Sequence, residues 1–260
     1  MSGLTRLTHL DLGWTAVRDL TGLTNVPALA VLRLVNCKQL RDLTGIAAAA
    51  NLSELVIEDC PRLQSVRGFG HHPRLTTLEI MGCPDLSDLL GLSALTHVTE
   101  LRIAGSERLV SLAGVGALPS LEKITFENCP ALADFASLAD LTTPFRLHLD
   151  GLNLIRDLTP FASLRGLHTL SLDKCHGLLE LTGLDSHHAL EELSVSHTDS
   201  LRGPGDLGRL PALRELEFSG LPSLTDLGRL DGLTALTKVG VRDCRALTDI
   251  RGWPGPRSPT

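Results

Sequence analysis

Apolar residues recur along this chain in a unit of 23 residues. The unit begins L-x-x-L-x-L-x-x-C and continues with apolar residues three positions apart. We number it from its first leucine, so that the cysteine is position 9. The units open at Leu7, Leu29, Leu52, Leu75, Val98, Leu121, Pro144, Leu167, Leu190, Leu213 and Leu236. A fixed period of about 20–29 residues predicts a solenoid, because one unit is too small to bury its own apolar face.

The second half of each unit has a period of three. Its apolar residues fall at positions 12, 15, 18 and often 21, as Leu86, Leu89, Leu92 and Leu95 do in the unit that opens at Leu75. That spacing favours tight 3₁₀ turns over an α-helix, since a 3₁₀ helix has three residues per turn. Glycine recurs at position 17, where it accepts backbone angles that other residues avoid.

All six cysteines occupy position 9. We predict that this position points into the solenoid, where a small side chain can hydrogen-bond the turning backbone of its own and the next coil. The thiols are then structural and reduced. A disulfide between neighbouring coils is within reach but has poor geometry, because the Cβ directions are parallel. Zinc is disfavoured because no histidine shares the position and no CxxC pair occurs. The residues are Cys37, Cys60, Cys83, Cys129, Cys175 and Cys244.

The charge and the ends of the chain limit the classes of function and the location that we expect. The chain has 24 basic and 30 acidic residues, and it lacks the basic stripe of a nucleic-acid-binding protein. No apolar run is long enough to cross a membrane, and no signal peptide is visible. Unpaired cysteines suit a reducing compartment, so we expect a cytoplasmic protein. We expect one domain over residues 1–253 and a disordered tail over 254–260. The first unit lacks a polar cap, which predicts fusion or docking to a neighbouring domain at the N-terminal end.

The L-x-x-L-x-L-x-x-C pattern resembles the leucine-rich repeat family, which usually has asparagine at position 9. The resemblance covers about residues 4–253. It implies an α/β solenoid, an arc of about eleven coils of 22–23 residues. In that family positions 3 to 5 form a strand, the strands make a parallel β-sheet on the concave side, and 3₁₀ turns and loops lie on the convex side.

Some stretches of the repeat are similar in style to repeats of actinobacterial proteins, which are rich in Leu, Thr, Ala, Gly and Asp. Such arrays resemble the sensor arrays of bacterial NACHT (STAND) NTPases, relatives of innate immune receptors. The resemblance implies a non-enzymatic module that recognises a protein through its concave face, as the sensor of a larger NLR-like NTPase. The alternative is a stand-alone or surface adhesion or scaffold protein. The stretches are Asp42-Leu43-Thr44-Gly45-Ile46 and Asp226-Leu227-Gly228.

Nothing in the sequence predicts an enzyme. We find no credible Ser/His/Asp or Cys/His constellation, and the chain contains no G-x-x-x-x-G-K-[ST] motif. The two histidine pairs, His71-His72 and His187-His188, fall on the return half of their units and are interpreted as turn residues. We therefore expect no catalytic residues, no metal site and no cofactor.

Binding is expected on the outward positions 3, 5, 7 and 8, where acidic residues outnumber basic ones. This balance favours a protein partner with a basic or polar surface. A first candidate is a carboxylate column at position 7, whose like charges a partner or a cation could neutralise, or solvent alone could screen. A second is a group of acidic residues farther along. These candidates are Glu127, Asp150 and Asp173 in the column, and Glu192, Glu215 and Glu217 in the second group.

A third candidate is a run of apolar residues on the first four units, with acidic residues around it. Exposed apolar patches with a charged rim commonly mark interfaces. Trp14 is the aromatic residue of this group and its best hot-spot candidate. Lateral ion pairs are expected beside it, such as Arg102 with Glu79, and elsewhere Lys238 with Glu215. The patch is Trp14, Val31, Val35, Val56 and Met81, and its rim is Glu54, Glu58, Asp59 and Glu79.

Overall fold

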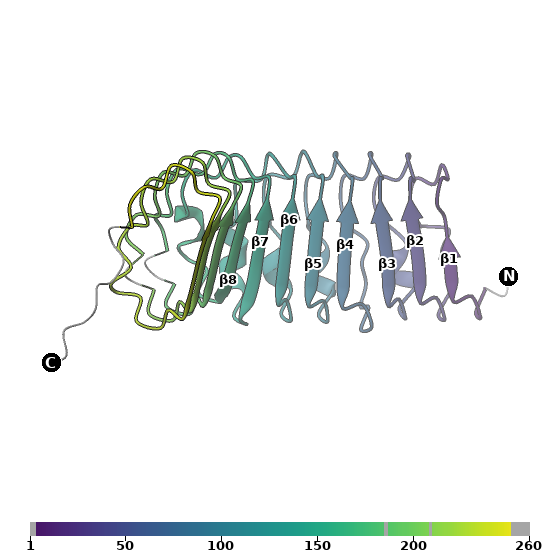
Figure 1. The fold of residues 1–260 in the computed structure, drawn as a ribbon. Coiled ribbons are helices and arrows are strands. Elements are labelled where there is room, and N and C mark those ends of the chain that lie inside the picture. The colour runs from purple at the N-terminus through teal and green to yellow at the C-terminus, as the bar shows by residue number, and fades with distance from the viewer. Residues whose placement is uncertain (1–3, 185–186, 208–209, 251–260) are drawn as a thin grey trace. The chain divides into compact units, whose positions relative to one another are not determined.

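The chain folds as a parallel solenoid in a computed structural model that describes residues 4–184, 187–207 and 210–250. Strands β1 to β6 pair in chain order as parallel neighbours (Figure 1), and strands β7 to β11 do the same. The predicted solenoid and its parallel sheet are confirmed. The predicted tail, residues 254–260, and the domain boundary at 253 lie outside the described residues.

Its internal contacts group the chain into two compact units, which we describe separately: residues 1–143 and residues 144–260. In the first unit the strands are β1 (His9–Asp11), β2 (Val31–Val35), β3 (Glu54–Glu58), β4 (Thr77–Met81), β5 (Glu100–Ala104) and β6 (Lys123–Glu127), and the 3₁₀ helices are η1 (Ile46–Ala48), η2 (Leu92–Ala94), η3 (Val115–Ala117) and η4 (Ala136–Asp140). In the second unit the elements are β7 (Phe145–Asp150), η5 (Thr159–Phe161), β8 (Leu167–Asp173), β9 (Glu192–Ser196), β10 (Glu215–Ser219) and β11 (Lys238–Arg242).

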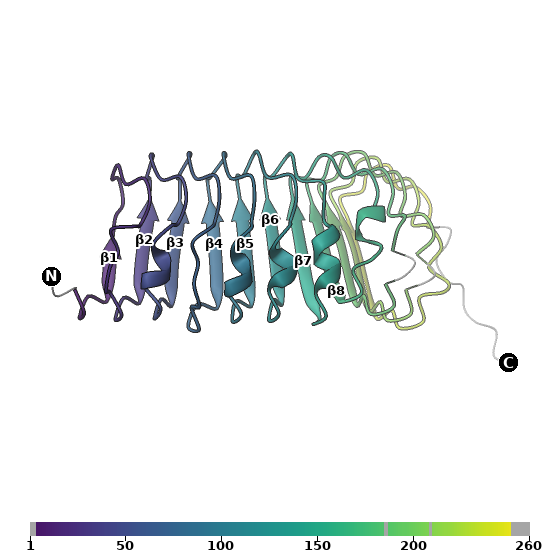
Figure 2. The ribbon, with the colours of Figure 1, turned by 180° about the vertical axis from the view of Figure 1, so that it is seen from behind.

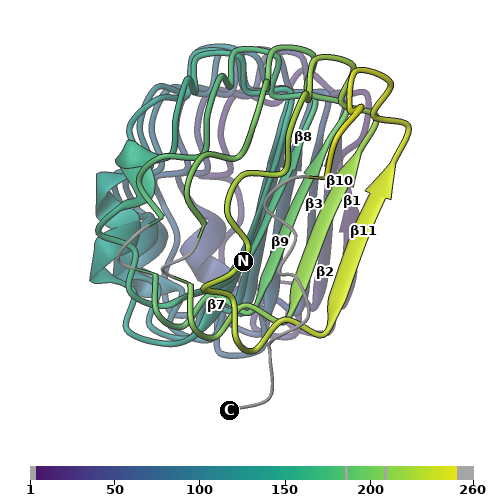
Figure 3. The same cartoon turned by 60° about the vertical axis from the view of Figure 1, so that its left-hand side comes forward.

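Each coil has its strand on one side and its return segment on the other (Figure 3). The strands typically span positions 3–7, two residues longer than expected, because the backbone stays paired up to Val35 and its counterparts. The return segments carry the short 3₁₀ helices (Figure 2), as the period of three predicts. Leucines of both halves meet between these two sides, and nearly all of them are fully buried.

The residue at position 8 has a left-handed backbone in every coil. Its φ angle lies between 48° and 72°, a region that glycine, asparagine and aspartate enter at least cost. The chain therefore turns out of the sheet immediately after the strand. Position 8 belongs to this turn and not to the sheet face, where we expected it. Its occupants are Trp14, Asn36, Asp59, Gly82, Gly105, Asn128, Gly151, Lys174, His197, Gly220 and Asp243.

The stretch from Asp42 to Ile46 builds the entry to the return segment. The Asp42 carboxylate accepts a hydrogen bond from the Thr44 amide at 2.8 Å, closing an Asx turn. Gly45 then adopts φ 106°, and the Ile46 amide donates to the Leu43 carbonyl as η1 begins. The same aspartate bond recurs at Asp88 and Asp226. The aspartate of these stretches thus has a structural role within the coil.

The cysteines lie inside the solenoid and are not bridged, as predicted; all are buried except Cys244, which is partly exposed. Five of the six thiols, all but that of Cys83, contact a carbonyl of the preceding coil. Cys60 Sγ is 3.2 Å from the Leu34 carbonyl of the preceding coil and 3.5 Å from that of Glu58 in its own. The expected bond to the next coil is thus replaced by one to the preceding coil. Burial raises the pKa of Cys129 and Cys175 to about 11, so both are neutral thiols at physiological pH.

Ser106 occupies the same position without its hydrogen bond. Its hydroxyl is buried and has no partner among the described residues. A buried hydroxyl without a partner costs about 1–3 kcal/mol, whereas a thiol needs a partner far less. We expect Ser106→Cys to raise the free energy of unfolding by about 1 kcal/mol, measured from urea unfolding. Cys129→Ser, the reverse exchange one coil later, should lower it; a loss of stability in Ser106→Cys would contradict this account.

The second unit opens with an irregular coil. Pro144 stands where the other coils have leucine or valine, and Phe145 is buried in its place. Phe145 pairs with Leu167 and Arg146 with Thr169, so the register shifts by one residue between them. The β-bulge restores the usual frame for the rest of β7.

His72 and His187 are not turn residues, which corrects the interpretation of the two histidine pairs. Both are buried at position 21, where other coils place Leu95 or Leu118 in the core. His72 Nδ1 donates to the Ala49 carbonyl at 3.1 Å, and its Nε2 accepts from the Gly70 amide at 3.4 Å. This pattern suits the neutral ring. Burial lowers the pKa of His72 and of His187 below the usual value.

Acid should therefore destabilise the fold before any carboxylate titrates. With a lowered pKa in the folded state, the unfolded chain binds the proton first, so stability is complete above about pH 6.5 and falls as the pH drops. Each histidine adds a slope of at most about 1.4 kcal/mol per pH unit. We expect His72→Leu to flatten the dependence of the unfolding free energy between pH 7.5 and 5. An unchanged slope in His72→Leu and in the double variant with His187→Leu would contradict this.

Candidate functional site

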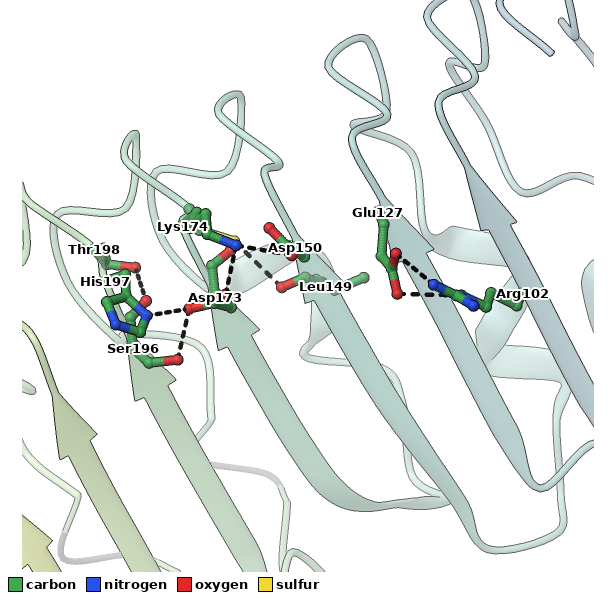
Figure 4. Close-up of polar contacts among 10 residues, drawn as sticks. Arg102, Glu127, Leu149, Asp150, Asp173, Lys174, Ser196, His197 and Thr198 are labelled. Atoms are coloured by element: carbon green, nitrogen blue, oxygen red, sulfur yellow. Dashed lines mark hydrogen bonds and ion pairs between the residues drawn. The ribbon is translucent and has the colours of Figure 1, made fainter. Parts of the chain in front are cut away.

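Glu127, the first member of the predicted carboxylate column, is paired within the first unit. The Arg102 guanidinium holds it by two bonds, Nη2 to Oε2 at 2.9 Å and Nε to Oε1 at 3.2 Å (Figure 4). The expected ion pair between Arg102 and Glu79 is wrong. The two residues are neighbours in the strand register, but the guanidinium turns to the strand on its other side.

The aspartates of the column are also neutralised by their own chain. Lys174 Nζ lies 3.3 Å from Asp150 Oδ2 and 3.1 Å from Asp173 Oδ2 (Figure 4). Asp173 Oδ1 accepts from Ser196 Oγ at 2.8 Å and lies 2.7 Å from His197 Nδ1. Partial burial raises the pKa of Asp173, but these hydrogen bonds outweigh it and bring the pKa to about 2.

These contacts weaken the physical reason for a ligand at the column, although Asp150 Oδ1 is buried without a partner in the described structure. Its like charges were expected to attract a basic group or a cation, and Lys174 and Arg102 already supply that charge. Across the described part of the chain, no three or more His, Cys, Asp or Glu side chains are grouped as a metal site requires.

Most of the acidic group of the second unit is paired in the same way. Lys238 Nζ lies 2.6 Å from Glu215 Oε2, which confirms the predicted pair, and Arg242 Nη1 lies 2.5 Å from Glu217 Oε1. Glu192 stands beside Glu215 in the register and accepts a long hydrogen bond, 3.5 Å, from Thr169. Only Glu192 of the three keeps a charge without a basic neighbour within 4 Å in the described structure.

The remaining candidate lies on β2 to β4 and the turns after β1 and β3, and we call it the β1–β4 surface. Its apolar and acidic residues are interleaved and do not form one apolar patch. Along one row Val35, Glu58 and Met81 are lateral neighbours, and along another Val56 lies beside Glu79. The β1–β4 surface consists of Trp14, Val31, Val35, Glu54, Val56, Glu58, Asp59, Glu79 and Met81.

The charges of this surface are not balanced within the chain. Arg33 is 3.8 Å from Asp11 and 3.9 Å from Glu54, contacts at the limit of an ion pair. In the described structure no basic side chain lies within 4 Å of the carboxylates of Glu58, Asp59 or Glu79. The β1–β4 surface therefore keeps a negative field that the paired acids elsewhere do not have.

Trp14 combines two unfavourable features. Its side chain is 77% exposed, and its backbone has φ 60°, a conformation that costs a bulky residue about 1–2 kcal/mol. Lys174 and His197 share this backbone, but both contact Asp173. The ring of Trp14 has no such role in the described structure. The unusual residue could have been found from the sequence by aligning position 8 of all coils, because most occupants there are Gly, Asn or Asp.

Comparison with models of protein families gives no match, and comparison with curated proteins gives none either. Solved structures do match. An internalin, InlF, from Listeria monocytogenes is 20% identical with a TM-score of 0.50, over 96% of this chain and 78% of that one. The chain has the leucine-rich repeat fold.

Two further leucine-rich repeat proteins of Listeria monocytogenes are similar. Internalin C2 is 22% identical with a TM-score of 0.47, over 69% of this chain and 81% of that one. The functional domain of InlJ, described as including a cysteine ladder, is 18% identical with a TM-score of 0.43, over 95% of this chain and 65% of that one. Identities this low describe the fold and carry no function across. No helix of the described chain is long and apolar enough to span a membrane.

Proposed function

We propose that this chain is a non-enzymatic recognition module that binds a basic or polar protein partner through the β1–β4 surface. The observation that carries the proposal is Trp14, a largely exposed aromatic side chain held on a costly backbone. Strain of this kind persists where a residue serves a function that outweighs it. Exposed tryptophan is also the residue type most enriched among binding hot spots.

The charge of the surface supports the kind of partner. Glu58, Asp59 and Glu79 project around Val56 and Met81 with no basic side chain near them, whereas Glu127, Asp150 and Asp173 are held by their own chain. A partner with lysine or arginine at its surface gains attraction at the first group and little at the second. The proposal includes no nucleic acid, no membrane and no cofactor.

The finer proposal places the module in the cytoplasm, as the sensor part of a larger bacterial NLR-like NTPase. The open face of the first coil supports a neighbouring domain at the N-terminal end. Leu4 is 66% exposed, and Leu7 and Leu10 are only partly covered, whereas their counterparts in the next coil, Leu29 and Leu32, are buried. Apolar coil faces of this kind need a cap. An NTPase motif encoded upstream would support this role, and a secretion signal there would favour the surface adhesion alternative.

Capture with the intact chain tests the main proposal. The chain is immobilised, proteins are recovered from the cells that encode it, and the recovered partner is purified for calorimetry. We expect Trp14→Asn and Glu58→Gln each to weaken its binding at least tenfold. Val110→Asn is the matched control, since Val110 is 54% exposed in the same unit but away from the sheet face. Equal affinity of all four proteins would refute the β1–β4 surface as the binding site.

A further inference from the structure

The sheet of the first unit opens between β3 and β4. Elsewhere in this unit, two amides at the start of each strand donate to one carbonyl of the preceding coil. Ser53 and Glu54 donate to Ala30 at 2.8 and 3.0 Å, and Thr99 and Glu100 donate to Thr76 at 2.8 and 3.1 Å. The same pair of bonds joins β1 to β2 and β5 to β6.

No such bonds join Thr76 and Thr77 to the carbonyl of Ser53. The register of β3 and β4 begins only at Val56 and Glu79, two residues later than the register of the other full-length strands in this unit. The amides of Thr76 and Thr77 and the carbonyl of Ser53 therefore lack the partners that their counterparts have. The coil that carries β3 also differs on its return side. The coils of β2, β4, β5 and β6 each contain a 3₁₀ helix there, and the coil of β3 does not (Figure 2).

A groove lies along this opening. It is lined by Ser53, Glu54, Val56, Thr77, Glu79 and Met81, and it reaches the otherwise buried Leu55 and Ile57. Val56 and Met81 supply apolar surface. The carboxylates of Glu54 and Glu79 come from opposite strands. Glu79 has no ion pair in the described structure, since Arg102 binds Glu127, and Glu54 has only the 3.9 Å contact with Arg33.

We propose that the groove between β3 and β4 binds an arginine side chain of the protein partner. A guanidinium carries five donors in a planar fork, which two carboxylates and the Ser53 carbonyl can accept. Its aliphatic stem can cover Val56 and Met81, as long basic side chains do on apolar surfaces. The amides of Thr76 and Thr77 offer donors to a main-chain carbonyl of the same partner segment. The inference rests on the proposed function and names the group that the β1–β4 surface recognises.

Small probes test the groove without the partner. The intact chain, labelled for NMR at its amides and at the methyl groups of Val56 and Met81, is titrated with N-acetyl-arginine methylamide, its neutral citrulline counterpart and its lysine counterpart. We expect saturable shifts of the Thr76 and Thr77 amides and the Met81 methyl with arginine, at least tenfold weaker binding of lysine, and none of citrulline. Shifts centred elsewhere, or equal binding of citrulline, overturn the proposal.

Charge variants separate the groove from a general negative field. We expect Glu54→Gln with Glu79→Gln to weaken arginine binding at least tenfold, and Glu107→Gln with Glu122→Gln, an equal loss of charge at exposed positions, to leave it unchanged. The purified partner separates this inference from the proposed function. If the partner loses affinity with Trp14→Asn but not with the groove variant, the arginine proposal fails and the surface stands. If neither variant affects the partner, both proposals fail.

Discussion

Gly45→Ala will lower the free energy of unfolding by at least about 3 kcal/mol. Gly45 has φ 106°, which residues with a Cβ rarely adopt, and that strain alone costs about 1–3 kcal/mol. A Cβ placed on it would also lie 2.1 Å from the carbonyl oxygen of Leu20 in the preceding coil. The backbone of one coil or the other must move, which disturbs the stacking on which a solenoid depends.

Gly22 is the matched control, because it is the glycine of the coil before that lies 23 residues ahead of Gly45, in the same Asp-Leu-Thr-Gly stretch. A Cβ there would meet no atom within 4 Å, and Gly22 is not among the residues with positive φ. We expect Gly22→Ala to leave stability unchanged or to raise it by up to about 1 kcal/mol, since alanine restricts the unfolded chain. Urea unfolding of both variants measures the difference. Equal losses at the two positions would show that stacking does not constrain position 17.

Trp14→Asn will make the protein more stable and a poorer binder. Asparagine adopts the left-handed backbone more readily, so we expect the free energy of unfolding to rise by about 1 kcal/mol. If the exposed ring is the hot spot of the β1–β4 surface, its loss costs about 2 kcal/mol of binding, or roughly a 30-fold rise in Kd. Thermal unfolding and calorimetry with the purified partner measure the two quantities.

Stability and affinity are expected to change in opposite directions, and this distinguishes a binding residue from a structural one. A residue that serves the fold loses stability when it is replaced, and a residue with no role changes neither quantity beyond the relief of strain. Gain of stability with loss of affinity is expected only for a residue kept for binding. Lys174→Asn offers a contrast at the same backbone position. It relieves the same strain but removes the contacts with Asp150 and Asp173, so it should gain less stability or lose some.

The repeat pattern was enough to predict the architecture. Eleven copies of the unit in one phase predict the eleven coils, because a side chain such as Cys60 can be buried only if its whole coil stacks in register. The period of three likewise predicts the 3₁₀ turns of η1 to η4. The left-handed turn at position 8 was also readable from its Gly, Asn and Asp residues, but we took that position for part of the sheet.

The site was predicted less well, because it depends on choices that a pattern leaves open. Register places Arg102 between Glu79 and Glu127 without saying which carboxylate its guanidinium binds. Lys174 neutralises the aspartate column from a turn residue, which a count of strand positions overlooks. The missing bonds between Ser53 and Thr77 have no counterpart in the repeat pattern.

The buried cysteines can serve as reporters of local opening along the array. Each thiol lies one to three coils from the next, and all but that of Cys244 are buried while their coils are closed. A thiol reagent can reach Cys37 or Cys175 only after that part of the chain opens, so its rate of labelling reports the local opening free energy. Cys244, already partly exposed, supplies the fast reference. Labelling followed by peptide mass analysis would give the opening free energy at each cysteine of the unmodified protein. Comparing these values would show whether opening spreads inward from an end or starts between β3 and β4.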